Sequence, residues 1–164
     1  MRYPFLLAAT AFAACISTAQ TAEEMLSPVD LSTPEDAVYS LMRGMYQGDA
    51  EMIDNVMLED GVFRRVVADG QVTPDGLDNW RDWVSTLDVG AAHEELFAVT
   101  SETFGNMATV WAPFIIRVNG TIVNCGVNTM TLAQVDEDWK IVFGMDTPAA
   151  RDTCETFKSA YLTE

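Results

Sequence analysis

Two kinds of hydrophobic spacing divide the chain. Up to about residue 90, apolar residues recur every three or four positions, which predicts amphipathic helices. One such stripe consists of Val38, Leu41, Met42 and Met45. Thr33-Pro34 and the two acidic residues after them are typical of a helix start. A second, short helix is expected after Asp49 and a third over about 78–87.

Beyond His93 the spacing is typical of strands joined by tight turns. The expected strands are 94–103, 107–118, 121–135 and 139–146, with a further short strand over 62–67. Helices followed by a run of antiparallel strands predict an α+β fold. We expect a long, bent sheet wrapped around three N-terminal helices, giving a cone with an open mouth.

Asn119-Gly120 is a strong signal for a two-residue type I′ hairpin turn, and such a turn fixes the pairing of its strands. Regular pairing predicts Phe114 opposite Cys125 and Ala112 opposite Val127. The other face of this hairpin then carries Trp111, Ile115, Asn124, Asn128 and Met130. Both faces are apolar, so we expect the second to be covered by another subunit, by the C-terminal tail or by a ligand.

The first 19 residues have the features of a signal peptide, with one Arg, an apolar run and a small-residue cleavage site. A lipoprotein signal with Cys15 as the lipid acceptor is the alternative. The prediction is a flexible lead-in over 20–32, one domain over 33–154 and a C-terminal tail over 155–164, in a periplasmic or secreted protein. The apolar run is too short to cross a bilayer, so stable membrane insertion is not expected.

Two cysteines, Cys125 and Cys154, remain once the leader is removed. In an exported chain such a pair predicts one disulfide, with two separately buried thiols as the alternative.

The charge of the chain limits its partners. With 25 acidic and 9 basic residues the formal net charge is −16, so no basic patch for nucleic acid or an anionic membrane surface can be assembled. Hydrophobic residues make up 49% of the chain, enough for an ordinary core.

Four segments together resemble the nuclear transport factor 2-like superfamily, in particular its bacterial SnoaL-like and lumazine-binding-like members. They are "TPEDAVYSLMRGMYQGDAEMI", "WAPFIIRVNG", "CGVNTMTL" and "EDWKIVFGMDT". The resemblance covers about residues 33–154 and implies the cone fold, often as a homodimer. It also implies that Cys154, after the last strand, pairs with the strand cysteine. The superfamily includes isomerases, dehydratases, epoxide hydrolases, cyclases and non-catalytic members, so no reaction follows from it.

Candidate catalytic groups are few. An isomerase of this fold needs a carboxylate base and a hydrogen-bond donor, for which Asp146 and a tyrosine, Tyr46 or Tyr39, are candidates. His93 is the only histidine and could serve a His–Asp mechanism. Each has a structural alternative: a turn for Asp146, a core-edge ring for Tyr46 and an exposed, idle side chain for His93. The sequence suggests no metal site and no cofactor.

An apolar pocket with a few polar points is the remaining prediction. Its expected ligand-binding residues are Met42, Tyr46, Trp80, Trp111, Phe114, Asn124, Asn128 and Met130. The leading hypothesis is an exported, non-catalytic domain that binds a small apolar molecule. The alternatives are a SnoaL-like or ketosteroid-isomerase-like enzyme that uses Asp146, and a homodimeric protein-interaction module.

Overall fold

The computed structural model describes residues 20–163. The helices are α1 (Ala22–Met25), α2 (Pro34–Gln47), α3 (Ala50–Val56), α4 (Leu77–Val84) and α5 (Cys154–Tyr161), with a 3-10 turn, η1 (Arg151–Thr153). The strands are β1 (Met57–Arg65), β2 (Ala92–Leu96), β3 (Thr100–Phe104), β4 (Met107–Val118), β5 (Thr121–Val135) and β6 (Asp138–Pro148). The predicted signal peptide and Cys15 lie outside the described residues.

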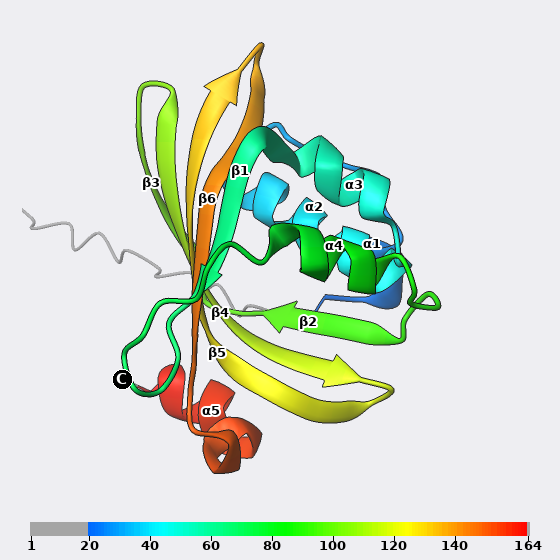
Figure 1. Ribbon diagram of the computed structural model, residues 1–164, viewed down its shortest axis with the longest axis vertical. Helices are drawn as coiled ribbons and strands as arrows, with labels where there is room; N and C mark the ends of the chain where they lie inside the picture. Colours follow the sequence, from blue (N-terminus) through cyan, green and yellow to red (C-terminus); the bar gives the residue numbers. More distant parts are fainter. Residues whose placement is uncertain (1–19, 164) are drawn as a thin grey trace, which may run out of the picture.

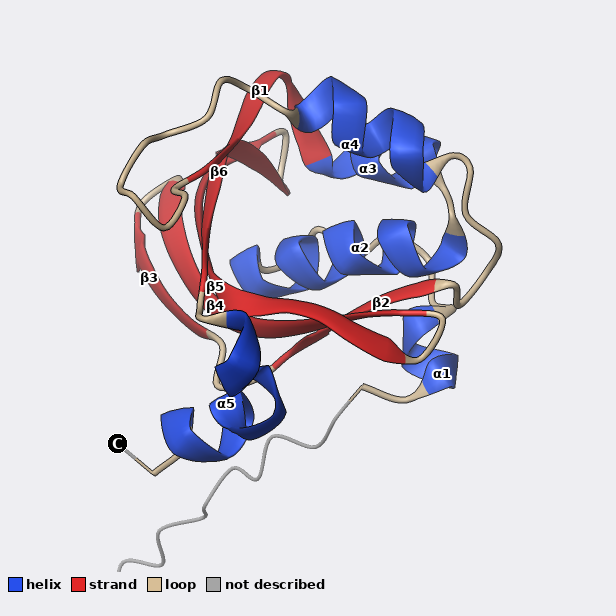
Figure 2. Cartoon of the chain, turned by 60° about the horizontal axis from the view of Figure 1, so that its bottom comes forward, coloured by secondary structure: helices blue, strands red, loops and turns tan. Residues whose placement is uncertain are grey.

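The six strands form one curved sheet in the order β1-β6-β5-β4-β2, and β3 pairs with β4 beyond the end of β2. β1 runs parallel to β6, and the other pairs are antiparallel. The sheet bends around α2, α3 and α4, whereas α5 lies on the opposite side (Figures 1 and 2). This arrangement confirms the predicted α+β cone.

The helix starts follow the capping signals in the sequence. The Thr33 side chain accepts a hydrogen bond from the Asp36 N–H at 3.1 Å, and Asp49 accepts one from the Met52 N–H at 3.0 Å. Gly48 ends α2 in the left-handed region, with φ 67°, which a residue with a Cβ adopts only at a cost. α4 ends at Val84, three residues before the predicted end.

The two long strands, β4 and β5, have the predicted bounds. The predicted strand over 94–103 is instead two strands, because Ala98 has a positive φ of 47° that interrupts the extended backbone. β2 and β3 therefore pair with successive parts of β4. β1 begins at residue 57, five residues before the predicted start at Val62.

The turn at Asn119-Gly120 is confirmed, since both residues have positive φ. The predicted regular pairing above it is wrong. Arg117 is opposite Ile122 but Ile116 is opposite Asn124, so Val123 is an extra residue in a β-bulge. From the bulge onward the two faces of β5 are exchanged relative to the prediction.

Because of this exchange Phe114 lies opposite Gly126 and not Cys125. Asn128 and Met130 share the inner face with Phe114 and contribute to the side of the sheet that meets the helices. Cys125 turns to the outer face, where it packs in a second cluster with Phe97, Ile115 and Cys154.

Cys125 and Cys154 form a disulfide, which confirms the predicted bridge. It holds α5 against the outer face, where Phe157 and Tyr161 of α5 pack on the Phe97 ring. The segment expected as a tail is thus largely helical. At the other end of the chain, α1 lies in the segment expected as a lead-in, and its Met25 is wholly buried in the main core.

Reduction of the disulfide should destabilise the fold. The bond joins residues 29 apart in sequence, and closing such a loop is worth roughly 3–4 kcal/mol. We expect the mass to rise by two hydrogen atoms on reduction and the free energy of unfolding in urea to fall by about that amount. The double variant Cys125→Ser/Cys154→Ser should keep both its mass and its free energy of unfolding when reductant is added. An oxidised and a reduced wild type of equal stability would contradict the prediction.

Candidate functional site

A cavity of about 390 Å³ lies between the inner face of the sheet and α4. It is lined by Met42, Phe63, Arg64, Arg65, Thr73, Gly76, Asn79, Trp80, Trp83, Glu94, Ile116, Asn128 and Asp146. These residues come from α2, α4 and five strands (β1, β2, β4, β5 and β6), together with the loop after β1. The site is therefore formed only when the sheet has closed around the helices.

Glu94 and Asn128 are buried polar residues of the cavity, with exposed fractions of 6% and 3%. Asn128 Nδ2 donates a hydrogen bond to Glu94 Oε1 at 2.6 Å. Burial, which disfavours the charged form, raises the pKa of Glu94 to about 7, and the negative charge of Asp146 adds to the increase. The hydrogen bond from Asn128 and the positive charge of Arg65 oppose it.

Asp146 is held by Arg65. The Arg65 Nε lies 2.9 Å from both carboxylate oxygens of Asp146, and its Nη2 donates a further bond to Oδ2. Asp146 is buried, whereas the Arg65 side chain is partly exposed. The hydrogen bond to Asp146 raises the pKa of Arg65. The pair places a carboxylate in the cavity with its counter-ion beside it.

The sheet register brings these groups into one row. Arg65 of β1 is opposite Asp146 of β6, and Asp146 is opposite Asn128 of β5. Asn128 then reaches Glu94 of β2 through the hydrogen bond. We call Arg65, Asp146, Asn128 and Glu94 the polar row. Inside an apolar cone it offers one ion pair, one amide and one carboxyl group that changes its protonation near neutral pH.

Aromatic side chains form the other wall of the cavity. The Phe63 and Trp80 rings are stacked, with centroids 6.0 Å apart and planes 16° from parallel. Trp83, one helical turn from Trp80, also lines the cavity and is partly exposed. We call Phe63, Trp80 and Trp83 the aromatic wall.

The structure brings together some of the residues predicted for the site. Met42, Trp80, Asn128 and the candidate base Asp146 all line the cavity. Phe114 and Met130 do not; both are wholly buried in the main core.

Two other predicted ligand-binding residues lie elsewhere. Asn124 is on the inner face but uses its Oδ1 to accept a hydrogen bond from the Cys125 N–H, and it is not among the lining residues. Trp111 lies on the outer face, where its Nε1 donates to the Tyr161 hydroxyl at 2.7 Å.

Tyr46 and His93 contact each other outside the cavity lining, edge to face with centroids 5.5 Å apart. Burial lowers the pKa of His93. Neither residue lines the cavity that contains Asp146.

Sequence reasoning missed Glu94 and Arg65. A signal for Glu94 was present: in β2 it alternates with Ala92 and Leu96, both buried on the same face. A carboxylate at such a position is directed into the core and needs an explanation. Arg65 carried no comparable signal, because its partner Asp146 is 81 residues away.

Within residues 20–163 there is no cluster of three or more His, Cys, Asp or Glu side chains that could hold a metal ion. None of the helices in that range has the length and apolar character needed to span a membrane.

No protein-family model matches the sequence, and no match is found among curated proteins. Solved structures of similar shape are numerous. A candidate dehydratase of the NTF2-like family from Streptomyces avermitilis is 19% identical, with a TM-score of 0.56 over 70% of this chain and 91% of the other.

Two further structures have the same shape. An NTF2-like protein with a cystatin-like fold from Novosphingobium aromaticivorans is 18% identical, with a TM-score of 0.54 over 69% of this chain and 77% of the other. A candidate calcium/calmodulin-dependent protein kinase type II association domain from Thiobacillus denitrificans is 12% identical, with a TM-score of 0.58 over 76% and 100%. These likenesses, with the curved sheet and the enclosed helices, show that the chain has the nuclear transport factor 2-like, or cystatin-like, fold.

Proposed function

We propose that the cavity binds a small, largely apolar molecule and that Glu94 transfers a proton to or from it. The observation that carries this proposal is the placement of Glu94, a buried carboxyl group in the cavity lining with one hydrogen bond from Asn128. Burying an ionisable group costs free energy, and a pocket that only stores an apolar molecule has no need of one.

The acid–base properties of Glu94 suit this role. A general acid or base works best when its pKa is close to the working pH, and the pKa of Glu94 is about 7. Asp146, the candidate base from the sequence, is instead engaged with Arg65 through several hydrogen bonds. We assign the Arg65–Asp146 pair to orienting the polar end of the ligand and setting the field around Glu94.

Non-catalytic binding, the leading hypothesis from the sequence, is the second candidate. The aromatic wall with Met42 and Ile116 gives the cavity a mainly apolar lining, which is sufficient to retain a ligand without any reaction. The two candidates differ in whether replacing Glu94 removes turnover or only changes affinity.

We propose export for the same chain. The segment 1–19 supports it, and a disulfide is compatible with an extracellular location. The likeness to a candidate dehydratase supports an enzymatic role at the level of fold only.

Replacement of Glu94 should abolish proton transfer. Small carbonyl compounds with a C–H group beside the carbonyl would be incubated with the protein in D₂O, and deuterium incorporation followed by mass spectrometry. Glu94→Gln keeps the hydrogen bond from Asn128 but cannot exchange protons, so incorporation should slow about 100-fold or more. Glu51→Gln, at an exposed residue of α3, should exchange at the wild-type rate. Stoichiometric binding with equal incorporation in wild type and Glu94→Gln would favour non-catalytic binding.

Glu94 should also make the stability depend on pH. Its pKa rises from 4.5 to about 7 on folding, so between these values the unfolded chain releases a proton that the folded chain keeps. The free energy of unfolding should therefore fall as the pH rises through this window, by about 3 kcal/mol in total.

The measurement is urea unfolding of wild type and Glu94→Gln at pH values from 4 to about 8. The stability difference between the two proteins should change by the predicted amount, because contributions from other groups cancel. Glu51→Gln, at an exposed residue of α3, should follow the wild type at every pH. A constant difference between wild type and Glu94→Gln would show that Glu94 ionises as it does in the unfolded chain.

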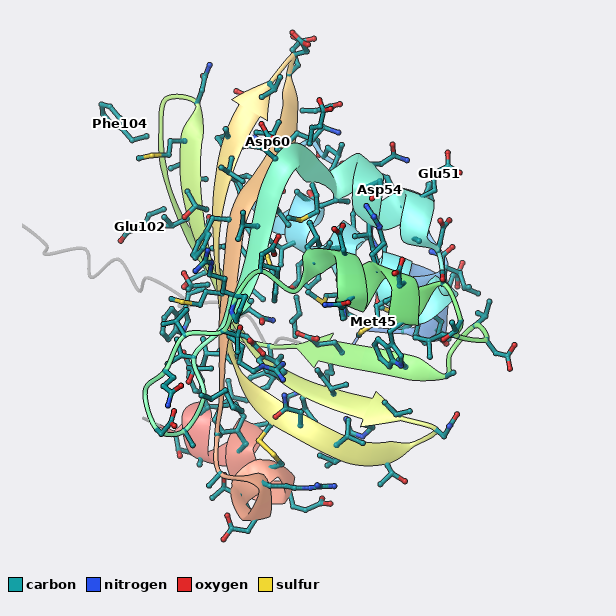
Figure 3. The ribbon with its side chains drawn as sticks, viewed as in Figure 1. Met45, Glu51, Asp54, Asp60, Glu102 and Phe104 are labelled. Atoms are coloured by element: carbon teal, nitrogen blue, oxygen red, sulfur yellow. A yellow bond between two sulfur atoms is a disulfide. The ribbon has the colours of Figure 1, made fainter. Side chains whose placement is uncertain are left out.

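A homodimer through the outer face of the sheet is proposed as well. Trp111, Phe104 and Met107 are 46%, 87% and 56% exposed there, and Figure 3 shows Phe104 and Glu102 projecting from β3 away from the helices. Neighbouring apolar side chains on one surface favour association.

Native mass spectrometry of the purified protein should give twice the mass of one chain. Trp111→Glu places a charge in the middle of the proposed interface and should give the mass of one chain. Val89→Glu introduces the same charge at an exposed apolar residue in the loop before β2, and should remain dimeric. A wild type with the mass of one chain would refute the dimer.

A further inference from the structure

The hydrogen bond between Asn128 and Glu94 uses only one polar atom of each side chain. Asn128 Nδ2 donates to Glu94 Oε1 at 2.6 Å, so the amide nitrogen is turned towards the carboxyl group. The amide oxygen, Asn128 Oδ1, and the second carboxyl oxygen, Glu94 Oε2, make no hydrogen bond with any residue from 20 to 163. Each side chain therefore keeps one oxygen for another partner.

Both free oxygens are open to the cavity. The side-chain polar atoms of the described chain that are fully enclosed without a hydrogen-bond partner belong to Gln20, Arg43 and His93. Asn128 Oδ1 and Glu94 Oε2 are not among them, although both residues are buried. Because both residues line the cavity, the space that reaches their free oxygens is the cavity itself. Buried polar groups are nearly always paired, and a molecule in the cavity can supply the partner here.

The two oxygens require different groups from a ligand. An amide oxygen only accepts, so Asn128 Oδ1 needs a donor. A protonated carboxyl group donates, so Glu94 Oε2 needs an acceptor. The Asn128–Glu94 hydrogen bond holds the two groups side by side, so the donor and the acceptor of the ligand must also be neighbours. An amide with an N–H beside its C=O has this arrangement, whereas a ketone lacks the donor and a carboxylic acid loses it on ionising.

The charged side chains that line the cavity with Glu94 are Asp146 of β6 and Arg64 and Arg65 of β1. The other elements around it, α2, α4, β4, β5 and the loop after β1, contribute residues that do not ionise, namely Met42, Thr73, Gly76, Asn79, Trp80, Trp83, Ile116 and Asn128. His93, the only histidine, does not line the cavity. Glu94 is therefore the cavity group that we expect to change its charge near neutral pH.

We infer that the cavity recognises uncharged amides with a free N–H, such as lactams, through Asn128 and Glu94 together. The N–H of the ligand donates to Asn128 Oδ1, and its C=O accepts a hydrogen bond from the protonated carboxyl group of Glu94. This inference rests on the proposed function in one respect, the assignment of the cavity as the ligand site. It does not depend on proton transfer.

Two probes that differ in a single group test the need for a donor. 2-Indolinone is a lactam, and in 2-indanone a CH₂ group replaces its N–H while the ring skeleton and the carbonyl group stay the same. Isothermal titration calorimetry of the wild type at about pH 5.5, where Glu94 keeps its proton, should show 2-indolinone binding about 10-fold more tightly or better. Equal affinities, or no binding of 2-indolinone, would overturn the inference.

Asn128→Leu removes the acceptor for the N–H of the ligand with little change in volume. In this variant 2-indolinone should bind no more tightly than 2-indanone. Asn79→Leu makes the same change at an exposed residue of α4 that also lines the cavity, and it should retain the preference for 2-indolinone. A preference that persists in Asn128→Leu would overturn the role of Asn128.

The affinity for 2-indolinone should also depend on pH. Ionised Glu94 has no proton to donate, so with a pKa of about 7 the affinity should fall by about 30-fold from pH 5.5 to about 8.5. In Glu94→Gln the side-chain amide donates at every pH, so the affinity should stay constant. Glu51→Gln should follow the wild type. A wild-type affinity that is constant or rises with pH would overturn the role of Glu94 as donor, and this measurement decides if Asn128→Leu does not fold.

The proposed function is judged separately, by the Glu94→Gln exchange experiment. A preference for 2-indolinone together with equal deuterium incorporation in wild type and Glu94→Gln would refute proton transfer alone. Slower incorporation in Glu94→Gln, without a preference of the wild type for 2-indolinone, would refute amide recognition alone.

Discussion

The bulge at Val123 in the β4–β5 pair determines which side chains of β5 face each side of the sheet. Side chains alternate along a strand, so one extra residue transfers every later side chain to the opposite face. With the bulge, Asn128 points into the cone, where it donates to Glu94, and Cys125 points outward, where it meets Cys154. Without it the cysteine would face the helices and the amide would face α5. The inner site and the outer attachment of α5 thus depend on the same local irregularity.

A second irregularity has the same effect one strand further. In the β5–β6 pair Thr131 is opposite Phe143 but Leu132 is opposite Ile141, so Val142 is the extra residue. Ile141, before this bulge, and Gly144 and Asp146, after it, can therefore all face the interior. The polar row needs both bulges, because Asp146 must share a face with Asn128 on one side and with Arg65 on the other. Bulges are found next to active sites for this reason, since they redirect side chains without ending the strand.

Much of the fold could be predicted from the sequence because its signals are local. The cap at Thr33, the stripe of α2 and the turn at Asn119-Gly120 each lie within a few residues, and the corresponding elements are present. The disulfide could be predicted because only two cysteines remain outside the leader. The faces of β5 could not, since a bulge in a strand of alternating polar and apolar residues leaves no mark that differs from regular pairing. Arg65 and Glu94 belong to the site because they form hydrogen bonds with residues 81 and 34 positions away in the sequence. No local sequence pattern predicts such distant pairs.

The free-energy cost of burying the polar row bears on the function of its residues. Asp146 is buried with Arg65 beside it, so its charge is compensated. Glu94 has only the Asn128 amide as a hydrogen-bond partner among the described residues, and its burial raises its pKa to about 7, so the folded chain keeps this proton to a higher pH than the unfolded chain does. A leucine at residue 94 would pack against the apolar neighbours without this cost, as Ala92 and Leu96 do on either side. A carboxyl group kept where an apolar side chain would be more stable supports the proposed proton transfer, because both its protonated form, which can donate to a bound molecule, and its ionised form, which can accept, are present near neutral pH.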